Sequence, residues 1–399
     1  MSVSYWQDTV GITTEENVDI IIIGAGLAGL STAYWLNKLD PNLDIKVIDK
    51  GKIGCGASGR NAGFITCGST EHFSRMVSAY GEDRASQIWK FTEYNHKLMV
   101  EEFGLDFLSK TCEYKQQGSW TLASTEHEME TIKNSVSYLQ KQGVRVEWFN
   151  DKYIKERFRP NSLSHACVEG FYGGAHYYAD AELHPVKYLW HLALASGTKV
   201  SILENREVFE LNTDSDKLEI KTNKNRFTAQ GIVVCTNAWS GQLFPWFKDK
   251  VTAVRGQIIV TEPVAPFLEP CYCSNVLDYF RQLADGRVLI GGFRNADIEK
   301  EVGFSDEINP TIHRKLEDFL NKHFPILREK RIDYRWSGVM GFARDGYPMV
   351  GALSEDPRIY YNVGFTAHGL GFTFATGELT ARLILEGKDP GIFSGRRFK

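Results

Sequence analysis

Short apolar runs and longer amphipathic stretches alternate along this chain from its N-terminal end. Residues 20–23 are four successive isoleucines. Isoleucine is β-branched and the run is too short for a helix, so the pattern predicts a strand of a parallel sheet that is buried on both faces. A Gly-x-Gly-x-x-Gly turn follows directly, with its glycines at Gly24, Gly26 and Gly29, and the apolar spacing then predicts a helix over 27–39.

This strand, turn and helix are typical of a dinucleotide-binding fold. Gly24 permits a tight turn, Gly26 lets the backbone approach a pyrophosphate, and Gly29 lets the helix pack closely on the strand. A second strand is predicted over 45–48 and ends in Asp49, twenty residues after Gly29, where a carboxylate accepts hydrogen bonds from adenosine ribose hydroxyls. A glycine-rich turn without a nucleotide is the alternative, and the register of all these elements favours the nucleotide.

The rest of the chain alternates between this pattern and a different one. Further helices are predicted over 82–103, 124–142, 184–196, 311–323 and from about 372 to 386, and further strands over 113–123, 144–148, 199–202, 207–211, 231–235, 251–261, 275–281, 288–292 and 359–364. The sequence therefore predicts an α/β fold, with a Rossmann-like dinucleotide-binding domain (17–82, 150–246 and 336–399) and an inserted, mostly antiparallel α+β substrate domain (83–149 and 247–335).

Composition narrows the class of protein. The 399 residues provide enough chain for two domains, and a net charge of −4 without a basic stripe argues against a nucleic-acid partner. The first seventeen residues lack the pattern of a signal peptide and no apolar stretch is long enough to span a membrane, so we expect a cytoplasmic protein. The seven cysteines are scattered, and Cys271-x-Cys273 has the wrong spacing for zinc. Neither a disulfide framework nor a metal site is expected.

Several later motifs resemble the D-amino acid oxidase superfamily, nearest to its gamma-glutamylputrescine oxidoreductase-like branch. They lie at 56–63, 277–281, 286–292, 333–338 and 364–369 and keep their order along nearly the whole chain. The resemblance implies an FAD enzyme that oxidises a carbon–nitrogen bond, with glycine oxidase and sarcosine oxidase among its relatives. Sarcosine-oxidase-type relatives carry a flavin-linking cysteine before the last motif, and here no cysteine lies between Trp336 and Ala367. We therefore expect non-covalent FAD.

Two loops are the main candidates for holding the flavin. Ser58, Arg60 and Asn61 would donate to the pyrophosphate and the ring, unless the arginine is only solvated on a mobile loop. The loop 368–371 would offer backbone N–H groups and a positive helix end to the reduced flavin, unless it is a plain strand-to-helix turn. The predicted cofactor-binding residues are Gly24, Gly26, Gly29, Asp49, Lys50, Ala57, Ser58, Arg60, Asn61, Gly63, Val208, Asn237, Gly338, Gly369, Leu370 and Gly371.

The predicted catalytic residues are Tyr279, Arg281 and His368. Hydride transfer from a neutral amine to flavin N5, followed by imine hydrolysis, needs positioning and a dry site more than a strong base. Tyr279 and Arg281 would orient the substrate, with Arg281 as a clamp for a substrate carboxylate, or they are a strand aromatic and a surface arginine. His368 would tune protonation near pH 7, although simple packing beneath the flavin is favoured.

Two other functions stay open from the sequence. One is a glycine or D-amino acid oxidase or dehydrogenase, and the other is an RNA-associated or regulatory flavoprotein without amine turnover. The expected partner is a small amine or amino acid, and the oligomeric state is left open.

Overall fold

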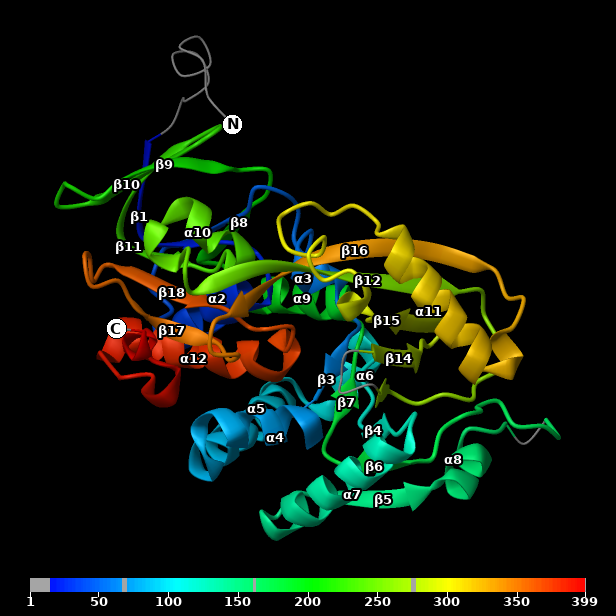
Figure 1. The fold of residues 1–399 in the computed structure, drawn as a ribbon. Coiled ribbons are helices and arrows are strands. Elements are labelled where there is room, and N and C mark those ends of the chain that lie inside the picture. The colour runs from blue at the N-terminus through cyan, green and yellow to red at the C-terminus, as the bar shows by residue number, and fades with distance from the viewer. Residues whose placement is uncertain (1–14, 67–69, 161–162, 274–277, 399) are drawn as a thin grey trace. The chain divides into compact units, whose positions relative to one another are not determined.

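The structure, a computed structural model, describes residues 15–66, 70–160, 163–273 and 278–398. The chain forms two compact units (Figure 1). Unit 1 comprises Met1–Arg60, Pro185–Val254 and Met340–Lys399, and unit 2 comprises Asn61–His184 and Arg255–Val339. Each unit is therefore assembled from segments that lie far apart in the sequence.

Unit 1 is built on an eight-stranded sheet with a parallel centre. In spatial order its strands are β17 (Met349–Ala352), β18 (Ile359–Val363), β11 (Arg226–Val234), β1 (Glu15–Ile23), β2 (Ile45–Ile48) and β8 (Val200–Leu203), and β10 (Leu218–Thr222) and β9 (Val208–Asn212) extend it beside β11. The strands from β18 to β8 are parallel, whereas β17 is antiparallel to β18. The isoleucines of β1 are buried, as expected for a central parallel strand.

The helices of unit 1 come from all three of its chain segments. They are α2 (Leu27–Leu39), α3 (Ala57–Arg60), α9 (Pro185–Ala195), α10 (Ser240–Leu243) and α12 (Gly369–Glu386), with 3-10 turns η1 (Asn237–Trp239), η2 (Pro245–Phe247), η5 (Gly391–Phe393) and η6 (Gly395–Arg397). α2 and α12 pack side by side, because a Cβ at Gly377 would lie only 2.7 Å from the Cβ of Ser31. Trp35 Nε1 also donates to the carbonyl of Phe374 at 3.0 Å.

Unit 2 holds most of a second eight-stranded sheet. Its order is β16 (Ile332–Ala343), β12 (Val251–Thr261), β15 (Val288–Gly291), β14 (Asp278–Gln282), β13 (Cys271–Cys273), β4 (Ser119–Leu122), β6 (Gly173–Tyr177) and β5 (Val146–Asn150). Most of these pairs are antiparallel, and β13 with β4 is parallel. A separate two-stranded sheet pairs β3 (Phe64–Ile65) with β7 (Ala181–Glu182).

One helix of unit 2, α11 (Pro310–His323), covers one face of this sheet, and the side chains of Tyr279 and Arg281 lie on the other face. The helices of unit 2 are α4 (Thr70–Tyr80), α5 (Glu82–Phe103), α6 (Leu105–Cys112), α7 (Glu126–Lys141), α8 (Asp151–Arg157) and α11 (Pro310–His323), with 3-10 turns η3 (Arg294–Ala296) and η4 (Pro325–Leu327). Leu316 and Phe319 of α11 join Phe280 and Ile290 of the sheet in one buried core. Side chains alternate along a strand, so Tyr279 and Arg281 on β14 lie on the opposite face.

The predicted fold class is confirmed, and most predicted elements occur. The predicted helices over 27–39 and 82–103 match α2 and α5. The strand predicted over 113–123 is wrong at its start, because Glu113 has a left-handed backbone (φ 54°) and ends α6. The predicted strand over 275–281 is seen from Asp278 onward, and its first three residues lie outside the described residues.

The compact units divide the chain at different points from the predicted domains. Residues 61–82 and 150–184, predicted in the dinucleotide-binding domain, fall in unit 2. The reason is strand pairing: β6 hydrogen-bonds between β4 and β5, and β7 pairs with β3. Gly338 also falls in unit 2, on β16.

Candidate active site

The turn between β1 and α2 requires glycine for steric reasons. Gly24 has a φ of +113°, and a Cβ there would lie 2.6 Å from the carbonyl oxygen of Cys235. A Cβ at Gly29 would lie 1.8 Å from the carbonyl oxygen of Gly24, so α2 can begin this close to β1 only with glycine. At Gly26 a Cβ would lie 2.8 Å from Ser58 Oγ. These contacts give each glycine of the motif a physical cause.

Polar groups converge on the same turn. Asp49 Oδ2 accepts from the N–H of Ala25 at 2.8 Å, and its Oδ1 accepts from the N–H of Gly51 at 2.8 Å. Ser58 Oγ accepts from the N–H of Leu27 at 2.9 Å. Cys55 Sγ also donates to Asp49 Oδ1, at 3.8 Å. An ionised carboxylate has about four acceptor sites, so Asp49 keeps capacity for a ribose hydroxyl. We call Gly24, Gly26, Gly29, Asp49 and Ser58 the glycine turn, and its residues fit the adenosine and pyrophosphate part of FAD.

Other predicted residues of unit 1 also have defined contacts. Lys50 Nζ lies 4.5 Å from the ring centroid of Trp239. Arg60, at the end of the helix that contains Ala57, donates from Nε to the carbonyl of Cys55 at 2.9 Å. Val208 begins β9 and pairs with β10. These contacts are compatible with a bound cofactor but give no evidence for one.

The loop that enters α12 has an unusual backbone. Thr366 and Ala367 both have positive φ, 49° and 66°, although neither is glycine. Such residues carry a strain of about 1–3 kcal/mol each and cluster at ligand sites. The N–H of Thr366 donates to the carbonyl of Gly341 at 2.9 Å, and its Oγ1 accepts from the N–H of Ala343 at 3.1 Å. These bonds hold the strained turn in place.

This turn leaves room at the start of α12. His368 is the N-cap residue, and no side-chain capping bond forms there. A Cβ at Gly369 would meet only a methyl of Thr373, at 4.0 Å, so the space beside this first turn is open. Leu370 and Gly371 follow within the same turn, where the backbone N–H groups and the helix dipole favour negative charge. The first turn of α12 therefore suits the polar edge of a flavin.

Asn237 has a structural task in the same unit. Its Oδ1 accepts from the N–H of Gly364 at 2.9 Å, and a Cβ at Gly341 would lie 2.5 Å from that oxygen. Asn237 thus joins the end of β11 to the strand-to-loop transition before α12.

Unit 2 presents aromatic side chains on the sheet face opposite α11. Tyr279 pairs across the sheet with Tyr272 and Gly291, and a Cβ at Gly291 would lie 2.5 Å from the Tyr279 ring. Phe64 lies 5.0 Å from Tyr272 and 6.2 Å from Tyr279, between ring centroids. We call Phe64, Tyr272 and Tyr279 the aromatic face. Burial raises the pKa of both tyrosines, so their hydroxyls stay protonated at physiological pH.

Arg281 lies on the same face and is held by internal partners. Its Nη1 donates to Glu182 Oε2 at 2.8 Å and its Nη2 to the carbonyl of Leu183 at 3.0 Å. Both charged side chains are buried, and Gln117 Nε2 donates to the other oxygen of Glu182 at 3.1 Å. A Cβ at Gly63 would lie 2.8 Å from Nη2. The charge of Arg281 is therefore compensated inside the protein, and it is not a surface arginine.

The structure thus gathers the predicted site residues into two groups. Gly24, Gly26, Gly29, Asp49 and Ser58 meet in unit 1, and Gly63, Tyr279 and Arg281 meet in unit 2. Asn61 also lies in unit 2, where its Oδ1 accepts from the N–H of Gly63 at 2.8 Å. Sequence reasoning missed Thr366, Ala367 and Glu182, because neither a positive φ at a non-glycine residue nor a distant ion-pair partner has a sequence signal.

Two further features bear on the class of protein. Across the described part of the chain, no cluster of three or more His, Cys, Asp or Glu side chains has the arrangement of a metal site. Of the helices in that part, none combines the length and apolar character that a membrane span requires.

The chain matches the family described as "DAO: FAD dependent oxidoreductase" over residues 19–383, and it belongs to this family. It is therefore an FAD-dependent oxidoreductase, as predicted.

Curated relatives share about a quarter of the sequence. "Probable oxidoreductase OrdL" of Haemophilus influenzae is 27% identical, with 97% of this chain and 90% of the relative covered. Gamma-glutamylputrescine oxidoreductase of Escherichia coli is 26% identical, with coverages of 92% and 83%. The crystal structure of glycine oxidase from Geobacillus kaustophilus has a TM-score of 0.78 at 21% identity, covering 95% and 98% of the two chains, and shows the same fold.

The names of these relatives agree with the predicted class of enzyme, an oxidoreductase of CH–NH or CH–NH2 groups, and the predicted resemblance is confirmed.

Proposed function

We propose that the chain oxidises a carbon–nitrogen bond of an amine, with FAD bound by unit 1 and the amine bound on the aromatic face of unit 2. The reaction removes a hydride from the carbon and a proton from the nitrogen of the CH–NH group, two electrons and two protons in all, to give an imine, which water hydrolyses to a carbonyl compound and a free amine. When bound, FAD supplies the two-electron acceptor. The substrate is a polyamine-derived or carboxylate-bearing amine.

The observation that carries the proposal in unit 1 is the glycine turn together with the first turn of α12. Asp49 would accept from the ribose, the backbone at Gly26 would pass along the pyrophosphate, and the N–H groups that begin α12 at Gly369 would face the flavin. No cysteine lies between Trp336 and Ala367, which supports non-covalent binding.

The aromatic face supports an amine as the substrate. Its rings exclude water from the reacting carbon and offer π-faces to a cationic or neutral amine. The Tyr279 hydroxyl stays protonated and can hydrogen-bond to the nitrogen lone pair or accept from its N–H group. Positioning of this kind, rather than a strong base, would determine the rate.

The contacts of Arg281 favour a positioning task over the predicted carboxylate clamp. Nη1 and Nη2 already serve Glu182 and Leu183, which belong to the β7 end of the two-stranded sheet. Phe64 pairs directly with Glu182 in that sheet. Arg281 would therefore set the position of Phe64, and through it the aromatic face, without touching the substrate.

The second candidate is an oxidase or dehydrogenase of glycine or D-amino acids. The likeness to glycine oxidases favours it: the Geobacillus kaustophilus enzyme is 23% identical with 92% coverage of both chains. An amino acid would require a cation for its carboxylate, and the internal pairing of Arg281 argues against that residue.

Anaerobic mixing of the FAD-loaded protein with a panel of amines and amino acids tests the proposal, with flavin bleaching as the readout. Amines without an adjacent carboxylate should bleach the flavin, whereas bleaching by glycine or D-amino acids alone would favour the second candidate. Tyr279→Phe should slow bleaching about tenfold, the size of one lost hydrogen bond. Tyr172→Phe is the matched control, because Tyr172 is exposed in the same unit. If no amine bleaches the flavin, the proposal is wrong.

A further inference from the structure

A segment of unit 2 presents four large apolar side chains to solvent. It runs over Asp297–Ile308, between η3 and α11, and we call it the apolar loop. Ile298 and Val302 are each 55% exposed, Phe304 is 45% exposed and Ile308 is 47% exposed. Exposed apolar side chains that gather on one segment, unlike single scattered ones, mark a surface that binds a partner.

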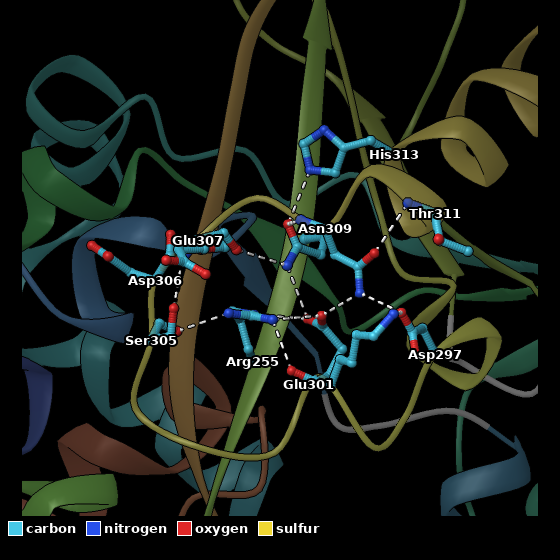
Figure 2. A network of polar contacts seen from close by, with 12 residues as sticks. Arg255, Asp297, Glu301, Ser305, Asp306, Glu307, Asn309, Thr311 and His313 are labelled. Carbon is cyan, nitrogen blue, oxygen red and sulfur yellow. Dashed lines mark hydrogen bonds and ion pairs between the residues drawn. The ribbon is translucent and has the colours of Figure 1, made fainter.

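The apolar loop is held by a buried polar network (Figure 2). Arg255 on β12 donates to Glu301 Oε1 at 2.9 Å and to the carbonyls of Lys300 and Ser305 at 2.8 and 3.3 Å. Glu301 is completely buried, and Gln257 Nε2 donates to its Oε2 at 2.9 Å. The loop is therefore fixed to the sheet at its centre, and its apolar side chains are displayed from a rigid base.

Its neighbours are fixed to the same base. Asn309 donates to Glu301 at 2.8 Å and accepts from the N–H of Thr311, which caps α11 (Figure 2). The Ser337 hydroxyl of β16 donates to the carbonyl of Asp306. The apolar loop, α11 and β16 thus form one continuous surface.

The two parts of this surface have net charges of opposite sign. The apolar loop carries the exposed acids Glu299, Asp306 and Glu307 and one exposed lysine, Lys300. Beside it, exposed residues of α11 and β16 form what we call the basic strip, made up of Arg314, Lys315, Lys322, Tyr334 and Arg335. The exposed acid Asp318 lies among them and Glu317 pairs with Arg335 at 2.7 Å, and the strip keeps a net positive charge. The strip contains one large exposed aromatic residue, since Tyr334 is 57% exposed. An acidic apolar area therefore adjoins a basic aromatic area.

We propose that this surface is the interface of a symmetric dimer, in which the apolar loop of each copy docks on the basic strip of the other. In a two-fold symmetric dimer, the apolar loop of the first copy contacts the basic strip of the second, and the apolar loop of the second contacts the basic strip of the first. Two adjacent complementary surfaces on one chain therefore form the same contact twice. Direct loop-on-loop contact would bring Glu299, Asp306 and Glu307 against their own copies and is disfavoured. The partner that fits the surface is thus a second copy of this chain.

Sedimentation velocity of the full-length, FAD-loaded protein, from about 1 to 100 μM, tests the proposal. A dimer is expected, with a dissociation constant that rises at higher salt because charges contribute. Val302→Asp with Phe304→Asp should raise that constant at least about 100-fold, since these side chains would lie at the centre of the contact. Leu194→Asp is the control: Leu194 is 82% exposed on α9 of unit 1, and its substitution should change nothing.

A charge exchange makes the test independent of folding defects. Arg314→Glu alone should weaken the dimer about tenfold, and adding Glu307→Arg should restore it to within about threefold, because the exchanged charges attract again across the contact. An unchanged thermal unfolding midpoint would show that each variant is folded. A wild-type protein that is monomeric throughout the range would overturn the proposal, and so would a dimer that the loop variants leave intact.

Discussion

Replacing Arg281 tests whether this residue positions the aromatic face or binds the substrate. Arg281→Lys keeps the positive charge, but a single ammonium cannot reach both Glu182 and the carbonyl of Leu183 as the two guanidinium nitrogens do. Arg281→Met removes the charge and leaves Glu182 buried beside Gln117 alone. Arg281→Lys therefore tests the loss of the second hydrogen-bond donor, and Arg281→Met tests the loss of the positive charge.

The expected size of the effect follows from burial. The side chains of Arg281 and Glu182 are only 8% and 4% exposed. Removing one partner of a buried ion pair costs about 3–5 kcal/mol, whereas replacing both by apolar residues costs little. Arg281→Met should thus destabilise unit 2 by about that amount, and Arg281→Met combined with Glu182→Met should recover most of it. Denaturant unfolding of the wild type, of the single variants Arg281→Met and Glu182→Met, and of the double variant gives the coupling energy directly.

Kinetics decide between the two tasks of Arg281. If it only positions Phe64 and Tyr279, Arg281→Lys should raise the half-saturating concentration of a carboxylated and an uncarboxylated amine by the same factor, within about threefold. The assay is anaerobic flavin reduction with one amine of each kind. A rise of about tenfold or more for the carboxylated amine alone would identify a carboxylate clamp and refute the reasoning from the Glu182 pair.

The remaining predictions concern the cofactor and acid stability. Asp49→Ala should raise the FAD dissociation constant at least about tenfold in a fluorescence titration, because ribose acceptors and two backbone contacts are lost; an unchanged constant would place the ribose elsewhere. Acid precipitation should release the flavin, since no cysteine lies between Trp336 and Ala367, and colour retained on the polypeptide would show a covalent link. Burial lowers the pKa of His313 below its ordinary value of about 6.5, so the stability present above that pH is lost as the pH falls towards the folded-state value. His313→Gln, which retains a possible donor to Gln257, should make the unfolding midpoint fall less steeply between pH 7 and 5; an identical slope would assign the acid sensitivity to other groups.

Local patterns predicted much of unit 1, because its key residues are close in sequence. The isoleucine run, the glycines and Asp49 lie within thirty residues, and the contacts of Gly29 with Gly24 and of Asp49 with Ala25 form within that segment. The side-chain contacts of unit 2 could not be predicted in this way, because they join residues that lie far apart in the sequence. Arg281 and Glu182 are 99 positions apart, and nothing local signals that they pair.

Backbone strain escaped prediction for a related reason. Thr366 and Ala367 both lie in the left-handed region, where propensity alone argues against such residues, and Thr366 is held there by bonds to Gly341 and Ala343 of β16. The same holds for the start of α12, which was expected near residue 372 and lies at Gly369. Tertiary contacts override local preference at such positions.

The most direct test of the proposed amine oxidation is a stoichiometric one. A single amine that bleaches the flavin should be mixed anaerobically with the FAD-loaded protein, in substoichiometric steps, and the carbonyl product measured by mass spectrometry in oxygen-18 water. One carbonyl compound should form for each FAD reduced, with its oxygen derived from water through imine hydrolysis. Bleaching without a carbonyl product, or a product that retains the intact C–N bond, would contradict the account.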